Sequence, residues 1–336
     1  MKIKNNTPYI IAEIGINHEG NFNLAKKSIK SASLAGAQAV KLQLFNPKTL
    51  AQKKSKKTKD QKKRTSNKES LFQMLARMKL SLNQLKKLKT YSKSLSLDFI
   101  CSIFDEESLQ LSKKIGLDAY KIASSDLTDL KLIYEIKKLD KPIILSTGMG
   151  SFNEIKNAIN ILKGKKVFLL HCVSLYPCPN KYINLNRIKS LEKRFNLPIG
   201  YSDHSGNIYS SLAATALGAE IIEFHVCFDK EIFGPDTKSS ITINQVKSLV
   251  VGIKEIKDSL SVGRINKNDK KLESIKDIFS KSLALKRDLK KGDKLSIDDL
   301  ESKKPANMGI SAEKFKNILG KHLKRDILKG EFLNLK

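Results

Sequence analysis

The chain has 336 residues, of which 40% are hydrophobic, so it is long enough for one large barrel with a small appendage or for two to three ordinary domains. Its four cysteines lack the paired spacing of a zinc ribbon and the density of a secreted disulfide scaffold. No apolar run approaches the roughly 20 residues of a membrane span, and the N-terminal run Tyr9–Ile16 contains Glu13 and no cleavage site. We therefore expect no membrane association and a cytoplasmic location.

The net charge of +29 is also typical of nucleic-acid-binding proteins. Lysine is spread from Lys2 to Lys336, however, and no recognition motif accompanies it. We interpret the charge as a compositional bias and expect no nucleic-acid partner, with a basic nucleic-acid-binding protein as the alternative. The densest cluster, Lys53 to Lys68, mixes lysine with Ser, Thr and Gln and has no aromatic residue for base stacking. It predicts a solvated, mobile loop.

Short apolar runs alternate with longer amphipathic stretches over the first 260 residues, the pattern of a parallel α/β fold. After the first run, Phe22, Ala25, Ile29 and Ala32 follow a helical period and Gly36 is placed to end the helix. Eight such units predict a (β/α)₈ TIM barrel, with a doubly wound open sheet as the alternative. The eight predicted strands are Tyr9–Ile16, Ala39–Phe45, Asp98–Phe104, Ala119–Ser125, Pro142–Thr147, Val167–Val173, Pro198–Asp203 and Ile221–Val226.

The C-terminal part of the sequence has a different pattern, with short pieces and tight glycine turns from Phe279 onward. Asp288–Leu295 resembles Asp326–Leu333, and Gly292 and Gly330 stand where each turn needs a positive φ. We predict a barrel over residues 1–260, a polar linker over 261–278 and a small domain over 279–336. That domain is small for independent stability, so we expect it to dock on another surface.

Polar residues gather where the predicted strands end, which in a barrel is one common mouth. A lysine inside an apolar strand is costly unless an anion meets it, so Lys41 and Lys121 predict an anion cradle. Ser146–Gly150, just before a predicted helix, could add backbone amides to it. Alternatively the two lysines pair with Glu13, Asp126 or Glu223 in a structural ion network.

His204 and His225 end consecutive predicted strands, so their imidazoles should be neighbours at the mouth. Two imidazoles with oxygen ligands suit Mn²⁺, Zn²⁺ or Co²⁺ and leave positions open for a substrate carbonyl. The alternative is a pair of structural histidines. We interpret His18 and His171 as structural, hydrogen-bonded to backbone near strand ends. Three cysteines, Cys101, Cys172 and Cys227, are expected to be small buried apolar residues.

Several motifs occur in order along the chain: Ala12–Gly20, Val40–Gln43, Ala119–Ile122, Ile144–Met149, His171–Cys172, Tyr176–Pro177, Ser202–His204 and Phe233–Asp236. Together they resemble the sialic-acid synthase family, which makes N-acetylneuraminate, legionaminate or pseudaminate. The residues from Lys281 to Lys336 resemble its antifreeze-like (SAF) domain. The resemblance implies a TIM barrel followed by a SAF β-clip domain, and condensation of phosphoenolpyruvate with an N-acetylated mannosamine-type sugar.

The resemblance also implies roles for particular residues. His204 and His225 match the ligands of a divalent metal, usually Mn²⁺, with Mg²⁺ or Co²⁺ as alternatives, and Glu13 and Asp126 match catalytic positions. The sugar-binding positions correspond to Gln43, Tyr176, Asp236 and Lys304. The family's domain-swapped homodimer places the SAF domain on the partner's barrel. Phosphoenolpyruvate-binding positions correspond to Lys41, Ser102, Lys121, Ser124, Ser146, Ser174 and Ser202.

The sequence departs from the family at some of these positions. Asp126 stands where the N-acetylneuraminate enzymes commonly carry Glu, Ser102 where they carry Thr, and Ser174 where some carry Asn. Lys304 replaces an arginine that reaches the sugar's N-acetyl group, which exchanges a planar fork for a point charge. The sequence leaves three sugars open, N-acetylmannosamine and the precursors of legionaminate and pseudaminate. A different phosphoenolpyruvate-condensing synthase of the 3-deoxy-sugar type is the alternative function.

Overall fold

The computed structural model describes residues 7–66, 68–232, 234–260 and 270–334, and the chain divides into two compact units, Met1–Ser261 and Val262–Lys336. The predicted linker, 261–278, includes most of the helix α13 (Lys270–Phe279), while residues 261–269 lie outside the described residues. Phe233, from the last barrel motif, also lies outside them.

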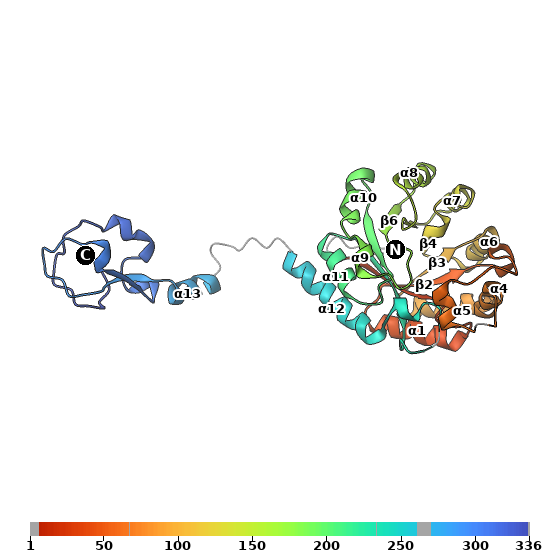
Figure 1. Ribbon diagram of the computed structural model, residues 1–336, viewed down its shortest axis with the longest axis horizontal. Coiled ribbons are helices and arrows are strands. Elements are labelled where there is room, and N and C mark those ends of the chain that lie inside the picture. The colour runs from red at the N-terminus through yellow and green to blue at the C-terminus, as the bar shows by residue number, and fades with distance from the viewer. Residues whose placement is uncertain (1–6, 67, 233, 261–269, 335–336) are drawn as a thin grey trace. The chain divides into compact units, whose positions relative to one another are not determined.

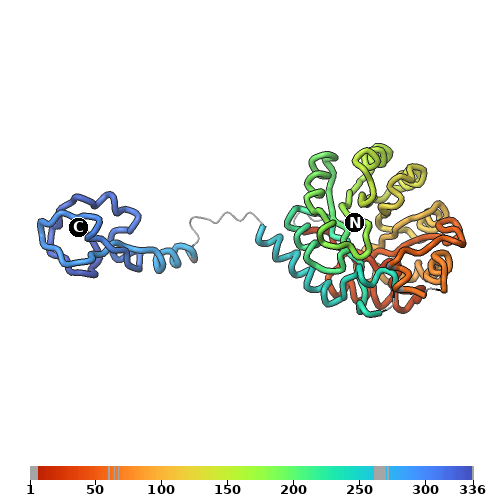
Figure 2. Tube along the Cα trace, viewed as in Figure 1, coloured from red at the N-terminus to blue at the C-terminus, as the bar shows by residue number. Residues whose placement is uncertain are grey.

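The first unit is a closed parallel barrel (Figures 1 and 2). Each of the first eight strands pairs in parallel with the next, and β1 also pairs with β8, which places Glu13 beside His225. This closure confirms the predicted (β/α)₈ barrel and excludes the doubly wound sheet. The strands are β1 (Tyr9–Gly15), β2 (Ala39–Leu44), β3 (Asp98–Ile103), β4 (Ala119–Ile122), β5 (Ile143–Ser146), β6 (Val167–His171), β7 (Ile199–Asp203) and β8 (Ile221–Cys227). A short ninth strand, β9 (Ser240–Thr242), adds to β8.

Helices form the outer layer of the barrel, as Figure 1 shows. The first, α1, is capped at its N-terminus by Asn21, whose side chain accepts a hydrogen bond from the Leu24 amide at 3.0 Å. This helix buries Ala25, Ile29 and Ala32. The chain leaves this helix through Gly36 at φ 96°, as predicted. The helices are α1 (Phe22–Leu34), α2 (Pro47–Leu50), α3 (Lys59–Arg64), α4 (Leu71–Met78), α5 (Leu82–Ser94), α6 (Glu106–Ile115), α7 (Leu130–Lys137), α8 (Phe152–Ile161), α9 (Asn180–Ile183), α10 (Arg187–Phe195), α11 (Tyr209–Ala216) and α12 (Ile243–Leu260). Two 3₁₀ turns, η1 (Ser124–Asp126) and η2 (Thr237–Ser239), follow β4 and β8.

The barrel interior is arranged in layers. An apolar cluster that includes Ile11, Ala39, Ile100, Ala119 and Ile221 fills it. Side chains of a strand alternate between its faces, so the residues two positions further along also point inward. These are Glu13, Lys41, Ser102, Lys121 and Glu223. The alternation of side chains along each strand therefore places a layer of polar residues next to the apolar cluster.

The lysine-rich segment before α4 corrects one prediction. It is not uniformly solvated, because Lys57 is only 7% exposed and residues 59–64 form α3. A capping box between Thr58 and Gln61 begins that helix, with both of its hydrogen bonds present. Composition predicted a loop because it does not distinguish one buried lysine from its exposed neighbours.

The second unit is built around the predicted repeat. Its strands β10 (Ser282–Leu285) and β11 (Leu300–Lys303) pair antiparallel, with 3₁₀ turns η3 (Ile297–Asp299), η4 (Ala306–Met308) and η5 (Ala312–Asn317). Leu289 and Ile327 exchange backbone hydrogen bonds of 3.0 Å. Asp288 accepts from the Lys329 amide at 2.7 Å, and Asp326 accepts from the Lys291 amide at 2.8 Å. The two copies of the repeat thus hold each other reciprocally, and both predicted glycines have positive φ.

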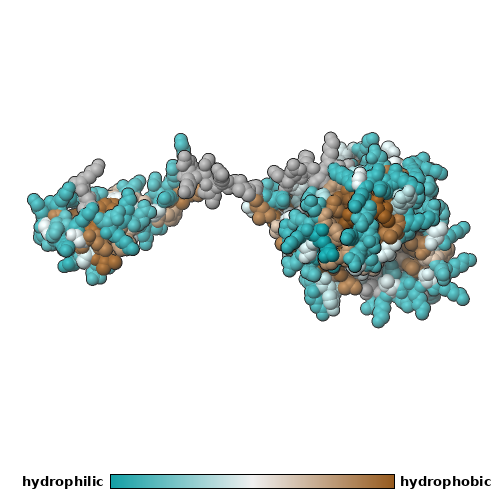
Figure 3. Space-filling view, turned by 90° about the horizontal axis from the view of Figure 1, so that it is seen from above, coloured by the Kyte–Doolittle hydropathy of each residue, from teal (hydrophilic) through white to brown (hydrophobic). Residues whose placement is uncertain are grey.

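The surface agrees with the composition. Figure 3 shows hydrophilic side chains over most of the visible face of each unit, with apolar side chains gathered over part of the barrel face. No helix within the described ranges is long and apolar enough to cross a membrane.

Candidate active site

A cavity of about 540 Å³ opens at the carboxyl ends of the barrel strands. Its lining includes every barrel residue that the sequence predicted for the site except Asp126. The predicted residues in the lining are Glu13, Lys41, Gln43, Ser102, Lys121, Ser124, Ser146, Ser174, Tyr176, Ser202, His204, His225 and Asp236.

Four buried charges form the floor of the cavity. Lys41 lies 2.9 Å from the Glu13 carboxylate and 3.8 Å from Glu223, and Lys121 lies 2.7 Å from Glu223. All four residues are at most 4% exposed. The ion network that we considered as an alternative is therefore present, with Glu13 and Glu223 as its acids and without Asp126. It forms part of the cavity wall, so it is open to a ligand.

The charges of this network depend on one another. Burial would raise the pKa of Glu223, but Lys121, Lys41 and a 2.8 Å hydrogen bond from Ser202 lower it to about 2. Burial would lower the pKa of Lys41, but Glu13 and Glu223 outweigh that effect and raise it. The pKa of Lys121 is lowered by burial, which Glu223 offsets in part. Two cations thus face the cavity, each held by a carboxylate.

A tightly packed glycine and several serine hydroxyls surround the cavity near the lysines. A Cβ atom added at Gly148 would lie 2.7 Å from Cys172 Sγ and 2.9 Å from Ser174 Oγ, so only glycine fits between them. Ser102 Oγ accepts a hydrogen bond of 3.1 Å from Lys41. The amide of Met149 donates to Ser124 Oγ at 2.7 Å, which joins the loops after β4 and β5. At the start of α8, Ser151 and Glu154 form a capping box with the backbone amides of the helix itself.

His204 and His225 are neighbours, with ring centroids 5.6 Å apart. His204 Nδ1 lies 2.8 Å from the Val173 carbonyl oxygen, so its Nε2 is left for the cavity, where the Tyr176 hydroxyl lies at 3.2 Å. His225 Nδ1 is buried without a hydrogen-bond partner in the described part of the chain. Burial lowers the pKa of both rings, which keeps them neutral, the form in which imidazole binds a metal.

These histidines fit a divalent metal that keeps open coordination positions. The described residues contain no group of three or more His, Cys, Asp and Glu placed to hold an ion. One of the two neutral imidazoles, His225, has an unsatisfied ring nitrogen, and a metal held by this pair would take its remaining ligands from substrate and water.

A second set of polar groups lies on the other side of His225. Asp236 Oδ2 is 3.7 Å from His225 Nδ1, and burial together with the charge of Glu13 raises the pKa of Asp236 to about 7. Gln43 donates to Glu13 Oε1 at 3.2 Å. Proton donors and acceptors are therefore available next to the imidazole pair.

Of the other two predicted site residues, Asp126 does not line this cavity and Lys304 belongs to the second unit. Asp126 is in η1, directly after Ser125, which lines the cavity. The Ser125 hydroxyl donates a hydrogen bond of 2.9 Å to the Asp126 carboxylate. Burial raises the pKa of Asp126 to about 6. Lys304 is an exposed residue of the second unit, with Nζ 4.5 Å from the Phe279 ring centroid.

The structure also adds residues that the sequence analysis missed. Thr58 and Gln61 line the cavity beside an apolar wall of Ile16, Met74, Leu75 and Phe104. The spacing Thr58-x-x-Gln61, a capping-box pattern, was the available signal.

The residues predicted to be structural are confirmed in that role. His171 Nε2 lies 2.7 Å from the Ile183 carbonyl oxygen, and His18 Nδ1 accepts from the Gly20 amide at 3.0 Å. Burial lowers the pKa of His18 to about 4. All four cysteines are buried and free, and Cys172 also lines the cavity.

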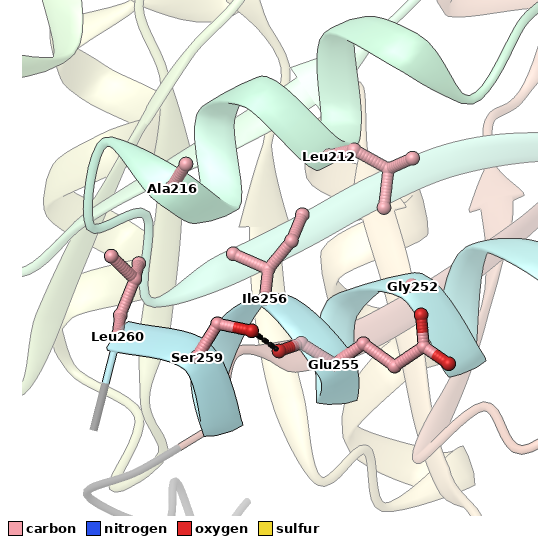
Figure 4. A pocket seen from close by; sticks show the side chains of 7 residues that line it. All are labelled: Leu212, Ala216, Gly252, Glu255, Ile256, Ser259 and Leu260. Carbon is pink, nitrogen blue, oxygen red and sulfur yellow. Dashed lines mark hydrogen bonds between the residues drawn. The ribbon is translucent and has the colours of Figure 1, made fainter. Parts of the chain in front are cut away.

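A groove of about 450 Å³ lies on the outside of the barrel between α11 and α12 (Figure 4). A Cβ atom added at Gly252 would lie 2.7 Å from Leu212, so close packing of the two helices shapes it. Glu255 is the one charged residue in the lining of the groove, and this lining contains no cluster of chemically active groups. The lining is Leu212, Ala216, Gly252, Glu255, Ile256, Ser259 and Leu260. The mouth of the barrel is therefore the candidate active site.

The fold and this site define a class, a (β/α)₈ enzyme with an anion cradle and a neutral histidine pair at the barrel mouth. Residues 28–265 match the NeuB family and residues 280–335 match the SAF domain. The chain belongs to the NeuB family, and the resemblance to sialic-acid synthases is confirmed.

Characterised relatives are similar over nearly the whole chain. The N,N'-diacetyllegionaminic acid synthase of Campylobacter jejuni is 41% identical, over 96% of this chain and 98% of the relative. The pseudaminic acid synthase of the same species is 32% identical, over 97% of this chain and 95% of the relative. A solved N-acetylneuraminic acid synthetase from Leptospira borgpetersenii has a TM-score of 0.71 at 33% identity, covering 82% of this chain and 93% of that structure.

Proposed function

We propose that this enzyme condenses phosphoenolpyruvate with a diacetamido sugar to give an N,N'-diacetyllegionaminate-type acid and phosphate. The reaction class, joining phosphoenolpyruvate to an amino sugar, is that of the family. The observation that carries the proposal is the buried Lys41–Lys121 pair, which faces the same cavity as two neutral imidazoles. The choice of sugar is supported by the 41% identity to the Campylobacter legionaminic acid synthase and by the apolar wall of the cavity.

The residues divide into two groups in this reaction. Lys41 and Lys121, with Ser102, Ser146 and the other cradle hydroxyls, bind the phosphate and carboxylate of phosphoenolpyruvate. His204 and His225 would hold a divalent metal, for which we propose Mn²⁺, and this metal supplies polarisation of the sugar's aldehyde.

Carbon–carbon bond formation is followed by loss of phosphate. C3 of phosphoenolpyruvate bonds to the aldehyde carbon, water adds at C2, and phosphate leaves with cleavage of the C2–O bond. The aldehyde oxygen takes up a proton and the attacking water gives one up. Glu13 and Asp236 lie beside His225 and are the proposed proton carriers there, while Asp126 remains a candidate base next to the cavity wall. Gln43 and Tyr176 are proposed sugar contacts.

We further propose a homodimer in which the SAF domain of each subunit caps the partner's barrel. The small size of this domain and the family resemblance support it, and Lys304 is then placed to meet the acetamido group that all three candidate sugars share. The four free, buried cysteines support a cytoplasmic location. A sedimentation experiment that shows a monomer at micromolar concentration would contradict the proposed dimer.

The function is tested by supplying phosphoenolpyruvate, Mn²⁺ and a mixture of the three candidate sugars, and identifying the products by mass spectrometry after chromatographic separation against standards, because the legionaminate-type and pseudaminate-type products have the same mass. We expect phosphate release only when an N-acetylated sugar is present, with the diacetyllegionaminate-type product in excess. Lys121→Ala should abolish the release. Turnover of sugar phosphates instead would favour a 3-deoxy-sugar acid synthase.

A further inference from the structure

One buried lysine organises the segment that covers part of the cavity. We call residues 55–66 the cover segment. Its Lys57 is 7% exposed, whereas its neighbour Lys56 is exposed. Lys57 Nζ donates to Thr65 Oγ1 at 2.9 Å and to the Ser66 carbonyl oxygen at 2.5 Å, and lies 3.8 Å from Glu69.

Glu69 connects this lysine to the helix that follows. Arg77 of α4 donates to both carboxylate oxygens of Glu69, at 3.2 and 3.3 Å, and also contacts Glu19 from the loop after β1. Two-point contact between a guanidinium and a carboxylate fixes orientation as well as distance. The cover segment is thereby tied through Lys57 and Glu69 to α4.

The two side chains that this segment contributes to the cavity lining have hydrogen-bond donors without a partner. Thr58 Oγ1 accepts from the Gln61 amide at 3.2 Å, and Gln61 Oε1 accepts from the Thr58 amide at 2.9 Å. The capping box therefore engages both side-chain oxygens once, and it fixes which end of the Gln61 amide is the NH₂ group. The Gln61 NH₂ group and the Thr58 hydroxyl hydrogen have no partner among the described residues. A ligand that satisfies them must bring an acceptor oxygen.

The wall next to these donors is apolar. Met74 and Leu75 are buried in a cluster with Ile16, against which Phe104 packs, and all four residues line the same cavity as Gln61. An acetamido group carries both features that such a surface fits, a carbonyl oxygen that accepts a hydrogen bond and a methyl group that packs on apolar side chains. A plain hydroxyl carries only the first.

We propose that Gln61, assisted by Thr58, donates to the carbonyl oxygen of an acetamido group of the sugar, and that the methyl group of this substituent packs on Met74 and Leu75. Lys57 is the positioning residue that holds Gln61 there. This rests on the proposed function. Lys304 is assigned to the acetamido group that all three sugars share. Gln61 therefore binds the second acetamido group, which is present in a diacetamido sugar and absent from N-acetylmannosamine.

The decisive variant is Gln61→Glu. Glutamate keeps the acceptor oxygen of the capping box, so α3 retains its start, but it replaces the donor NH₂ with a carboxylate oxygen. Selectivity is measured as kcat/KM for the diacetamido sugar divided by kcat/KM for N-acetylmannosamine. We expect Q61E to lower this ratio about tenfold, the size of one lost hydrogen bond.

Gln84→Glu is the matched control. Gln84 forms the same box with Ser81, at 2.9 and 3.3 Å, at the start of α5, and does not line the cavity. We expect the selectivity of the Gln84→Glu variant to equal that of the wild type. An unchanged ratio in Q61E, or an equal loss for both sugars, overturns the inference while wild-type turnover leaves the proposed function intact. Wild-type protein that releases phosphate with none of the sugars overturns both.

A second pair of variants tests the positioning role of Lys57. Lys57→Met should raise KM for the diacetamido sugar about tenfold and leave KM for phosphoenolpyruvate unchanged, because the cover segment holds no residue of the anion cradle. Lys56→Met, which alters an exposed neighbour, should change neither constant. If K57M raises both KM values alike, Lys57 supports the barrel generally and its positioning role is rejected.

Discussion

Glu223 forms ion pairs with two buried lysines, and Glu223→Gln should be strongly destabilising. The substitution keeps the size of the side chain and removes its charge. At an effective dielectric constant of roughly 20, Glu223 attracts Lys121 at 2.7 Å by about 6 kcal/mol and Lys41 at 3.8 Å by about 4 kcal/mol. Because the desolvation of the carboxylate is also relieved, we expect a net loss of about 3–5 kcal/mol, the usual cost of breaking a buried pair.

Thermal unfolding followed by circular dichroism measures this loss. The midpoint should fall on the order of 10 °C for a domain of this size. Glu192→Gln, which removes an exposed acid paired with Lys189 at 2.9 Å, should leave it unchanged. Phosphoenolpyruvate should stabilise the E223Q protein more than the wild type, because its anion replaces the missing charge. A fall no larger than that of the control would refute the assignment of Glu223 as the counterion of both lysines.

Three further predictions concern the cavity. His204→Ala, or removal of divalent metal by a chelator, should lower phosphate release about a hundredfold or more; calorimetry should show weaker phosphoenolpyruvate binding, and restored Mn²⁺ should rescue the chelated wild type only. Gly148→Ala should raise KM for phosphoenolpyruvate on the order of tenfold or more, because its Cβ would lie 2.7 Å from Cys172 Sγ; an unchanged KM would place the anion elsewhere. Burial raises the pKa of Asp126 to about 6. The ionised carboxylate, which can accept a proton, is therefore present above that pH and is lost as the pH falls below it. Activity should therefore fall below about pH 6, and Asp126→Asn should remove that limb of the profile; a limb that persists would exclude Asp126 as the base.

The barrel could be predicted because its signal is periodic. Seven of the eight predicted strand runs contain the observed strand, and the eighth, Ile221–Val226, ends one residue before β8 does. The polar residues two positions after the apolar cluster, such as Lys41 after Ala39, point into the barrel as expected. Strand order brings the ends of β7 and β8 together, so the proximity of His204 and His225 followed from sequence position alone.

The cover segment could not be predicted in the same way. Its lysines look alike in composition, and only the tertiary contacts of Lys57 with Thr65 and Glu69 distinguish the buried one. The position of Asp126 just outside the lining was also beyond the sequence, because a 3₁₀ turn after β4 sets which of the residues at 124–126 face the cavity. Short irregular turns carry no periodic signal.

The charges of the site connect the lysines to the histidines. Lys41 and Lys121 are each matched by a buried carboxylate, Glu13 and Glu223, so the four charges nearly cancel before any ligand arrives. A phosphoenolpyruvate anion therefore enters a buried network with no net positive charge, which is costly in a low dielectric. The imidazoles cannot compensate by taking up protons, because burial lowers the pKa of both. A divalent cation held by His204 and His225 would supply the missing charge, and for this reason we expect metal removal to weaken phosphoenolpyruvate binding even though lysines make the direct contacts.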